Sequence, residues 1–368
     1  KFKAKYPTTQ HVQYDQSSHY GMLKANEESF GTAMIPSYDF SKAKVIVSVA
    51  ADFLTSWLSP VEFTKQYAAT RDVGENKKDM SRHYQFETGM SLAGANADYR
   101  TQIKPSEEGA VVVQLYNLLA EKAGQATVSG GVDKPNLKKA ADDLWNSRGN
   151  ALVVAGSNDK SVQVVVNAIN DLLGSYGSTI IPNIPVNYRQ GNDQAMADFV
   201  KEVNAGSVAG VIFYNCNPVY DHPMGAQLSA GLSKVQVKIA TSYKEDETAA
   251  LVDYIAPDHH FLEAWNDAEP KKNHYSLAQP AITPIFKSRA AQESFLIWAG
   301  ETNVDYFEVV KNNWKNWFYQ SGNFQTWWDQ CLYNGVLELP VEESAVSFAG
   351  DVAAAASAIA SNYKTGDG

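Results

Sequence analysis

The chain has 368 residues, of which 44% are hydrophobic and 20% charged, so it can bury one large core or two to three ordinary ones and is not a disordered chain. Its formal net charge of -10 argues against a nucleic acid or an anionic membrane surface as a partner bound through bulk charge. The two cysteines, Cys216 and Cys331, are too few for an iron–sulfur cluster, and no CxxCH is present to attach a c-type haem. We therefore expect two free, buried thiols.

Hydropathy along the chain predicts no membrane span. No apolar run approaches the ~20 residues that a bilayer requires, and the Ala-rich stretch at 349–360 is interrupted by Asp351. The chain begins with Lys1 rather than Met and carries no signal peptide or twin-arginine run, so we expect a processed product or a fragment.

The first part of the chain alternates between strand and helix patterns. The run 44–51 is apolar and β-branched, which is typical of a strand buried on both faces of a parallel sheet. Gly, Ser and Pro are frequent in 124–138, which favours a loop or linker. The other elements expected here are a strand near 11–14, a helix over 17–29, a helix over 61–71 opened by Pro60, a strand over 83–87, an extended segment over 98–104 and a helix from Ser106 to Gly124.

A second α/β pattern begins near Lys138. It comprises a helix over 138–147, a strand over 151–155, a helix with an apolar stripe from Val162 to Leu173, a helix over 193–205, a strand over 208–214, a helix over 225–232 and strands over 235–241 and 251–255. Strands that alternate with helices predict βαβ units and a mostly parallel sheet. We therefore predict an α/β protein with one Rossmann-like unit in 1–130 and another in 131–300.

Residues 301–368 form an aromatic-rich, mainly helical extension in this prediction. Its aromatic residues include Trp314, Trp317, Phe324, Trp327 and Trp328. Such a patch belongs either to a core or to an interface, and packing against another protein is the favoured interpretation.

Motifs for common chemistries are incomplete. Gly156–Ser161 lies between a strand and a helix but is not GxGxxG, so a dinucleotide fingerprint is missing. No GxxxxGK[ST] occurs, and Gly89–Ala93 is one residue short of a nucleophile elbow, which leaves an ordinary turn. Asn217–Tyr220 follows a strand at the edge where open α/β sheets bind ligands, but these residues carry no obvious chemistry.

Two clusters of titratable residues have alternative interpretations. His259, next to His260, and Glu263 are four residues apart and would share a helix face as metal ligands, or they form local hydrogen bonds at a strand end, which is favoured. Glu245–Glu247 could include an acid–base pair if one carboxylate were buried, but the segment is interpreted as a helix N-terminus. No catalytic, cofactor-binding or metal-ligating residue is assigned.

Several segments resemble a known superfamily. Within 244–265, Glu247–Ala250, an apolar run, Pro257 and Phe261–Glu263 are similar to the "TETA…ADVVLP…E" segment of the molybdopterin oxidoreductases. The other segments that match in order are Tyr38–Phe40 with the run ending at Leu54, 95–108 and 210–220. The match looks tighter to one branch, the molybdopterin-like domain in the large iron–sulfur component of bacterial alternative complex III, through 57–61, 80–100, 245–269 and 275–284.

The resemblance implies two Rossmann-like halves of the DMSO reductase-like type, which in active relatives clamp the guanosine ends of a bis-pterin molybdenum cofactor. Where those relatives carry a "DPR" turn, this chain has Glu87-Thr88-Gly89. Where they carry "PGTD", it has Pro105–Glu108. The lost glycine and the added carboxylate predict a domain without the cofactor.

By resemblance, the chain is then a scaffold domain of a membrane-associated respiratory quinol oxidoreductase, on the periplasmic side of the bacterial inner membrane, and is not itself catalytic. Iron–sulfur clusters and c-type haems are expected in neighbouring domains or subunits. The expected partners are an iron–sulfur domain, a multihaem cytochrome c and quinol-binding integral membrane subunits. The alternatives are an active molybdopterin-dependent domain and an unrelated two-lobed protein that binds a small solute.

Overall fold

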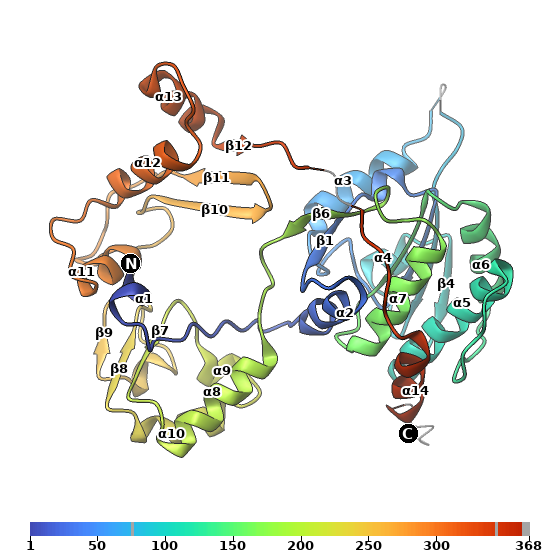
Figure 1. Ribbon diagram of the computed structural model, residues 1–368, viewed down its shortest axis with the longest axis horizontal. Helices are drawn as coiled ribbons and strands as arrows, with labels where there is room; N and C mark the ends of the chain where they lie inside the picture. The colour runs from blue at the N-terminus through green and yellow to red at the C-terminus, as the bar shows by residue number, and fades with distance from the viewer. Residues whose placement is uncertain (75–76, 343–344, 363–368) are drawn as a thin grey trace. The chain divides into compact units, whose positions relative to one another are not determined.

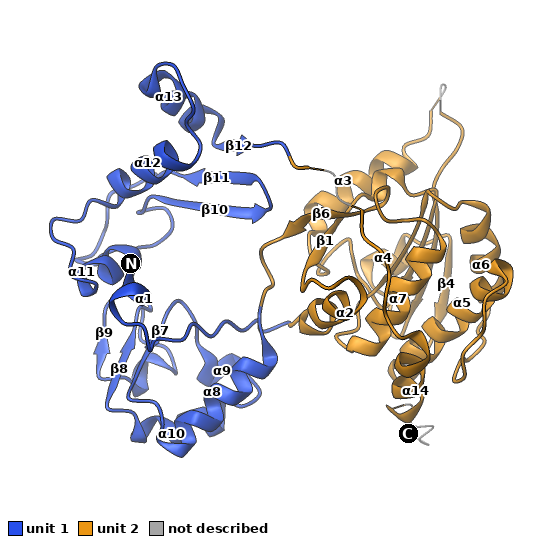
Figure 2. Cartoon of the chain, in the orientation of Figure 1, with its two compact units in different colours: residues 1–17, 191–340 blue, residues 18–190, 341–368 orange. Residues whose placement is uncertain are grey.

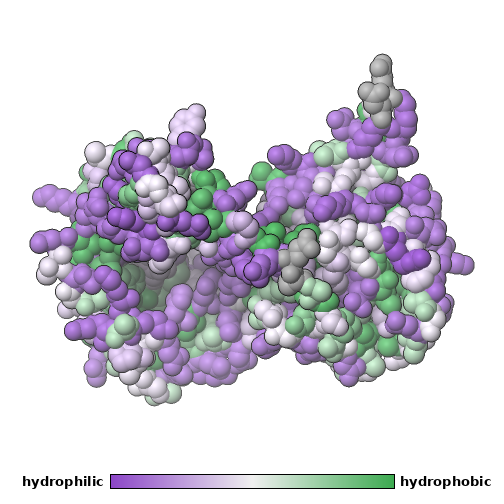
Figure 3. Space-filling model, turned by 45° about the horizontal axis from the view of Figure 1, so that its top comes forward, coloured by the Kyte–Doolittle hydropathy of each residue, from purple (hydrophilic) through white to green (hydrophobic). Residues whose placement is uncertain are grey.

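The computed structural model describes residues 1–74, 77–342 and 345–362, and the chain divides into two compact units (Figures 1 and 2). Unit 1 comprises residues 1–17 and 191–340, and unit 2 comprises 18–190 with the segment that begins at 341. Each unit therefore combines segments that are far apart in the sequence. On the face drawn in Figure 3, both units are largely hydrophilic, with hydrophobic areas between the polar residues.

Unit 2 is organised around a four-stranded parallel sheet with the strand order β4-β3-β2-β5. The strands are β2 (Val45–Val49), β3 (Arg82–Glu87), β4 (Tyr99–Gln102) and β5 (Ala151–Ala155). The central strand β2 pairs along its whole length with both β3 and β5. Every residue of β2 and β5 is buried, as expected for β-branched strands covered on both faces.

Helices cover both faces of this sheet. They are α2 (Tyr20–Phe30), α3 (Pro60–Arg71), α4 (Leu92–Ala95), α5 (Glu108–Ala123), α6 (Leu137–Asn146), α7 (Lys160–Leu172) and α14 (Val352–Asn362). Val45, Val47 and Val49 join the core made with α5, α6 and α7, whereas Ile46 joins the opposite core, to which α3 contributes. The Ala-rich segment forms α14, which packs into the first of these cores through Ala355, Ala356 and Ile359. An antiparallel pair, β1 (Ile35–Tyr38) and β6 (Ile180–Val186), completes the unit.

Unit 1 contains a smaller parallel sheet, β7 (Gly210–Phe213), β8 (Val237–Ala240) and β9 (Tyr254–Ile255). Its core includes Met196, Val200 and Val203 of α8 (Asp193–Ala205) and Leu228 of α10 (Gly225–Gly231). The remaining elements are α1 (Phe2–Lys5), α9 (Pro218–Asp221), β10 (Asn266–Lys271), β11 (His274–Ala278), α11 (Ala291–Trp298), α12 (Tyr306–Trp317), α13 (Phe324–Asn334) and β12 (Val336–Glu338). In neither unit does a described helix have the length and hydropathy to cross a membrane.

The predicted α/β class is confirmed, but the units do not follow the predicted segments 1–130, 131–300 and 301–368. A boundary at 130 would separate β5 from β2, which are hydrogen-bonded neighbours. The Gly- and Pro-containing loop at 124–138 only connects α5 to α6 inside unit 2. Residues 11–14, expected as a strand, pair with no strand in the described chain. The last segment is also divided, since residues up to 340 lie in unit 1 and α14 in unit 2.

Part of the aromatic segment forms a core, which corrects the favoured interpretation as an interface for Trp314 and Trp328, whereas Trp317 is exposed. Trp314 of α12 and Trp328 of α13 are fully buried and lie in one cluster with Val310 and Cys331. The Trp314 indole N–H donates to Asp267 Oδ2 at 2.8 Å, so its polar atom is satisfied as well. These two side chains are buried because α12 and α13 meet through them, with the ring centroids of Trp314 and Trp328 6.0 Å apart.

Trp314→Ala should lower the free energy of unfolding by about 3–5 kcal/mol, because it removes a large buried side chain. The matched control is Trp317→Ala in the same helix, where the side chain is 65% exposed and the expected change is within about 0.5 kcal/mol. Urea denaturation of the two variants measures both values. Equal losses in the two variants would contradict a core at α12.

Candidate functional site at the carboxyl edge of the unit 2 sheet

The carboxyl ends of the parallel strands in unit 2 form the edge where open α/β sheets bind ligands. From β2 the chain passes through α3 to β3 and then β4 on one side. It returns through α5 and α6 to β5 on the other side of β2. The winding therefore reverses between β2 and β5, and a ligand crevice is expected at this switch point.

At the switch point, the backbone that follows β5 packs against the backbone that follows β2. The Gly156 N–H donates to the carbonyl oxygen of Val49 at 2.9 Å. A Cβ added to Gly156 would lie 2.2 Å from the carbonyl oxygen of Ala50, so this close approach requires glycine. Ala50 itself adopts a left-handed φ of 54°. The turn that begins at Gly156 thus brings the ends of β2 and β5 together and leaves little room between them.

The N-terminus of α7, where such folds commonly hold an anion, is capped by the chain's own carboxylate. Asp159 Oδ1 accepts the N–H groups of Ser161 at 2.7 Å and Val162 at 3.3 Å. The preceding residue, Asn158, accepts the N–H of Gly21 at 2.8 Å through its Oδ1, so the start of α2 packs on this turn. The N–H groups of Ser161 and Val162, which could otherwise bind a phosphate, are therefore hydrogen-bonded within the chain.

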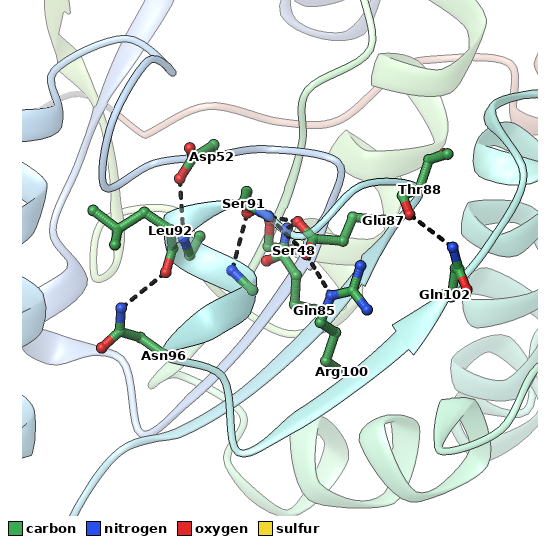
Figure 4. A network of polar contacts seen from close by, with 12 residues as sticks. Ser48, Asp52, Gln85, Glu87, Thr88, Ser91, Leu92, Asn96, Arg100 and Gln102 are labelled. Atoms are coloured by element: carbon green, nitrogen blue, oxygen red, sulfur yellow. Dashed lines mark hydrogen bonds and ion pairs between the residues drawn. The ribbon is translucent and has the colours of Figure 1, made fainter.

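At the end of β3, the buried carboxylate of Glu87 accepts four hydrogen bonds (Figure 4). Its Oε1 accepts from Arg100 Nε at 2.7 Å and from the Ser91 N–H at 3.1 Å. Its Oε2 accepts from Ser91 Oγ at 2.5 Å and from Gln85 Nε2 at 3.0 Å. Burial acts to raise the pKa of this carboxyl, but the bonds from Ser91, Arg100 and Gln85 outweigh it and hold the pKa below its usual value. Glu87 is therefore ionised at neutral pH.

The polar contacts continue from Glu87 along one face of β3. Alternate residues of a strand share a face, so His83, Gln85 and Glu87 lie on the same side. His83 Nε2 is 3.1 Å from Gln85 Oε1, and its Nδ1 is 3.2 Å from the Tyr67 hydroxyl. Because Gln85 donates its amide N–H to Glu87, its Oε1 is the acceptor and His83 Nε2 the donor. Burial lowers the pKa of His83 to about 4, so the ring is neutral near pH 7.

The loop after β4 carries the second altered position, in the 3-10 turn Pro105–Glu107. Glu107 Oε2 accepts the N–H of Lys104 at 3.0 Å and pairs with Lys134 Nζ at 2.7 Å. These two contacts hold the pKa of Glu107 below its usual value, the backbone bond contributing most. Glu108 is partly buried, and burial raises the pKa of its carboxyl. The added carboxylate of Glu107 is thus bound by neighbouring residues.

At the carboxyl edge of the unit 1 sheet, side-chain amides and hydroxyls connect the loops that follow the strands. Asn217 Oδ1 accepts from Thr248 Oγ1 at 2.7 Å, and its Nδ2 donates to Glu247 Oε2 at 2.7 Å. Asn215, which has a left-handed φ of 48°, donates from Nδ2 to Asp258 Oδ2 at 3.0 Å. These bonds tie the loops that follow β7, β8 and β9 to one another.

The structure does not assemble the residues considered as metal ligands. Glu263 accepts the N–H of His260 at 3.0 Å and the N–H of Ile285 at 3.1 Å, one on each carboxylate oxygen. His259 Nδ1 lies 2.8 Å from Ser288 Oγ. Among the described residues, no group of three or more His, Cys, Asp and Glu side chains is placed to hold a metal ion. The structure therefore shows local hydrogen bonds at these residues, which is the alternative that the sequence favours over a metal site.

The remaining predicted features have local structural roles. Asp246 Oδ1 accepts the N–H groups of Thr248 and Ala249, which starts the 3-10 turn Ala249–Leu251 and agrees with a helical N-terminus over Glu245–Glu247. Both cysteines are free, as expected, but only Cys331 is buried, whereas Cys216 is partly buried. Burial raises the pKa of Cys216 to about 12 and also raises that of Cys331, so neither is a thiolate near pH 7.

Gly94→Ala should destabilise the protein by about 1–3 kcal/mol, because the added Cβ would lie 1.8 Å from Glu87 Oε1 and push the carboxylate from its donors. Gly89→Ala is the matched control, since nothing lies within 4 Å of a Cβ there and its φ is not positive. The free energy of unfolding in urea distinguishes the two. Wild-type stability for Gly94→Ala would show that Glu87 is not held tightly.

Comparison with solved structures shows which known fold the chain resembles. Acetylene hydratase from Pelobacter acetylenicus superposes with a TM-score of 0.56 and 12% identity, over 77% of this chain and 51% of that chain. The formyltransferase/hydrolase complex from Methylorubrum extorquens gives a TM-score of 0.49 and 11% identity, over 77% and 81% of the two chains. The fold is that of the molybdopterin oxidoreductases, which confirms the expected superfamily fold.

A particular relative is found among curated proteins. The chain is 24% identical over 311 residues to the menaquinone reductase, molybdopterin-binding-like subunit, of Nitratidesulfovibrio vulgaris. The match covers 73% of this chain and 44% of that protein, so the chain spans less than half of its relative's length. No family model matches the chain.

The residues at the unit 2 edge do not fit an anionic, pterin-type cofactor. At the switch point, the Gly156 backbone packs against Ala50. At α7, the terminal N–H groups are bonded to Asp159. At β3, the buried carboxylate of Glu87 pairs with Arg100, and its negative charge would repel a second anion.

Proposed function

We propose that this chain is a cofactor-free domain of a quinone-linked respiratory oxidoreductase, in which a molybdopterin-enzyme fold serves as a structural part. The observation that carries the proposal is the carboxyl edge of unit 2, where Glu87 and Asp159 accept from donors that would otherwise face an anionic ligand at this edge. Similarity to a subunit described as molybdopterin-binding-like, from a menaquinone reductase, supports a place in such an assembly.

The relative and the sequence resemblance agree on a quinone but differ in the direction of the reaction. The relative is named for reduction of menaquinone, whereas resemblance to the large iron–sulfur component of alternative complex III implies oxidation of quinol. The finer assignment within the proposal is the alternative complex III type, on the periplasmic side of the inner membrane. Clusters and haems would then lie in the iron–sulfur domain and multihaem cytochrome c, and quinol would bind to integral membrane subunits.

An exposed apolar surface on unit 1 supports a role as one component of a larger assembly. This surface, the unit 1 loop patch, consists of Tyr243, Phe261, Ile282, Ile285 and Phe286. Phe261, Ile285 and Phe286 are 72%, 70% and 78% exposed. Phe261 and the residues from Ile282 to Phe286 lie on two loops that are joined, since the Leu262 carbonyl accepts the N–H groups of Ala281 and Ile282. Tyr243 lies on a third loop, with its ring centroid 6.4 Å from that of His260. Contiguous exposed apolar side chains of this kind mark protein contacts in soluble proteins, so another subunit of the assembly is the proposed occupant.

The cofactor content of the purified assembly that contains this chain tests the first part of the proposal. We expect no molybdenum or tungsten by elemental analysis and no oxidised pterin by fluorescence, measured per mole of chain. A related enzyme with a known molybdopterin content is the positive control. Stoichiometric metal together with pterin would reject the cofactor-free domain and favour the active-enzyme alternative.

Replacing two residues of the patch tests the second part. Phe261→Ser with Phe286→Ser should reduce the amount of partner subunits that co-purify with the chain by at least tenfold, because burying a Phe side chain contributes about 1.5–3 kcal/mol. Tyr333→Ser is the matched control, since Tyr333 is an 87% exposed aromatic of unit 1 outside the patch. Urea denaturation of each chain alone checks that its fold is intact. Normal incorporation of the double variant would rule out the patch as the interface.

A further inference from the structure

The hydrogen bonds around Glu87 have the composition of a carboxylate-binding site. A guanidinium N–H, a hydroxyl, a backbone N–H and an amide N–H converge on its two oxygens, and these groups come from β3, β4 and the turn before α4 (Figure 4). The carboxylate side chain is only 4% exposed, whereas the side chain of Arg100 is 26% exposed. Charge-assisted bonds of this kind are the strong ones, particularly away from water.

Contacts that do not involve Glu87 also hold its donors in place. Ser91 Oγ accepts the N–H of Gly94 at 3.0 Å, which orients its hydroxyl. Gln85 Oε1 is bonded to His83, which fixes the direction of the amide N–H. The turn before α4 is also held by Asp52, whose Oδ1 accepts the N–H of Ala93 at 3.0 Å. Ser91 and Gln85 are therefore held by other contacts and would keep their positions without the carboxylate, and the backbone of Arg100 is fixed by the pairing of β4 with β3.

We propose that Glu87 is a built-in ligand that occupies a pre-organised carboxylate site, and that removing its side chain opens this site to small free carboxylates such as acetate. Glu87→Ala deletes one methylene and the carboxylate, which together have the size of acetate. Gly94 supplies the room, since a Cβ there would collide with Glu87 Oε1. This inference goes beyond the proposed function, because it concerns only donors of the chain and holds whether or not the assembly contains a cofactor.

Chemical rescue of the full 368-residue chain tests the inference. The urea midpoint of Glu87→Ala is measured at neutral pH in increasing sodium acetate and in sodium chloride of equal ionic strength. We expect a midpoint below that of the wild type in chloride, and a saturable rise in acetate that chloride does not produce, because a ligand that binds only the folded state stabilises it. The wild type should show no difference between the two salts.

The double variant Glu87→Ala with Arg100→Ala provides the matched control. Without the guanidinium, the rise specific to acetate should disappear, whereas a general salt effect would persist in both variants. Equal midpoints of Glu87→Ala in acetate and chloride, or an undiminished acetate effect in the double variant, would overturn the proposal. If Glu87→Ala is unfolded in chloride, circular dichroism replaces the midpoint: folding in acetate alone supports the site, and an unfolded chain in both salts rejects it. Neither result depends on the cofactor content of the assembly.

Discussion

An ionised carboxylate inside a folded protein costs several kcal/mol unless its oxygens are hydrogen-bonded and its charge is paired. Glu87 meets this condition because Ser91, Gln85 and Arg100 all donate to its carboxylate. One buried charge therefore links the turn before α4 and the strand β4 to β3, in addition to the backbone pairing of β4 with β3. Through Gln85 and His83, the same constraint reaches Tyr67 on α3. The chain of contacts thus connects the edge of the sheet with the helix that covers it.

The same principle operates elsewhere along the carboxyl edges of both sheets, where polar groups of the chain bond to one another. Asp159 caps α7, Glu107 is held by Lys104 and Lys134, and Asn217 bonds to Thr248 in unit 1. In an open α/β fold, these are the positions from which a ligand would be held. An edge completed by its own side chains can keep the architecture of a cofactor-binding enzyme without the cofactor, which is the physical basis of the proposed structural role. A part of this kind acts through its surface, and the unit 1 loop patch is one surface that offers apolar contact.

Most individual elements could be predicted because their signals are local. The β-branched runs at Val45–Val49 and Ala151–Ala155 predict buried strands, and the apolar stripe from Val162 to Leu173 predicts α7. By contrast, β10, β11 and β12 were not predicted, because they are short or half-exposed and lack a clear alternation of apolar and polar residues. The altered positions Glu87 and Glu107 were found from the sequence, but their partners were not.

The sequence by itself determined the α/β class, the superfamily resemblance and the shortage of cysteine ligands, since these depend on composition and on patterns within short segments. Only the tertiary structure decided that β5 pairs with β2 across the predicted boundary, that Trp314 is buried in a core, and that Glu87 pairs with Arg100. These are contacts between different elements of the chain. No local periodicity specifies them, because they depend on the order in which strands pair and on which helix faces meet.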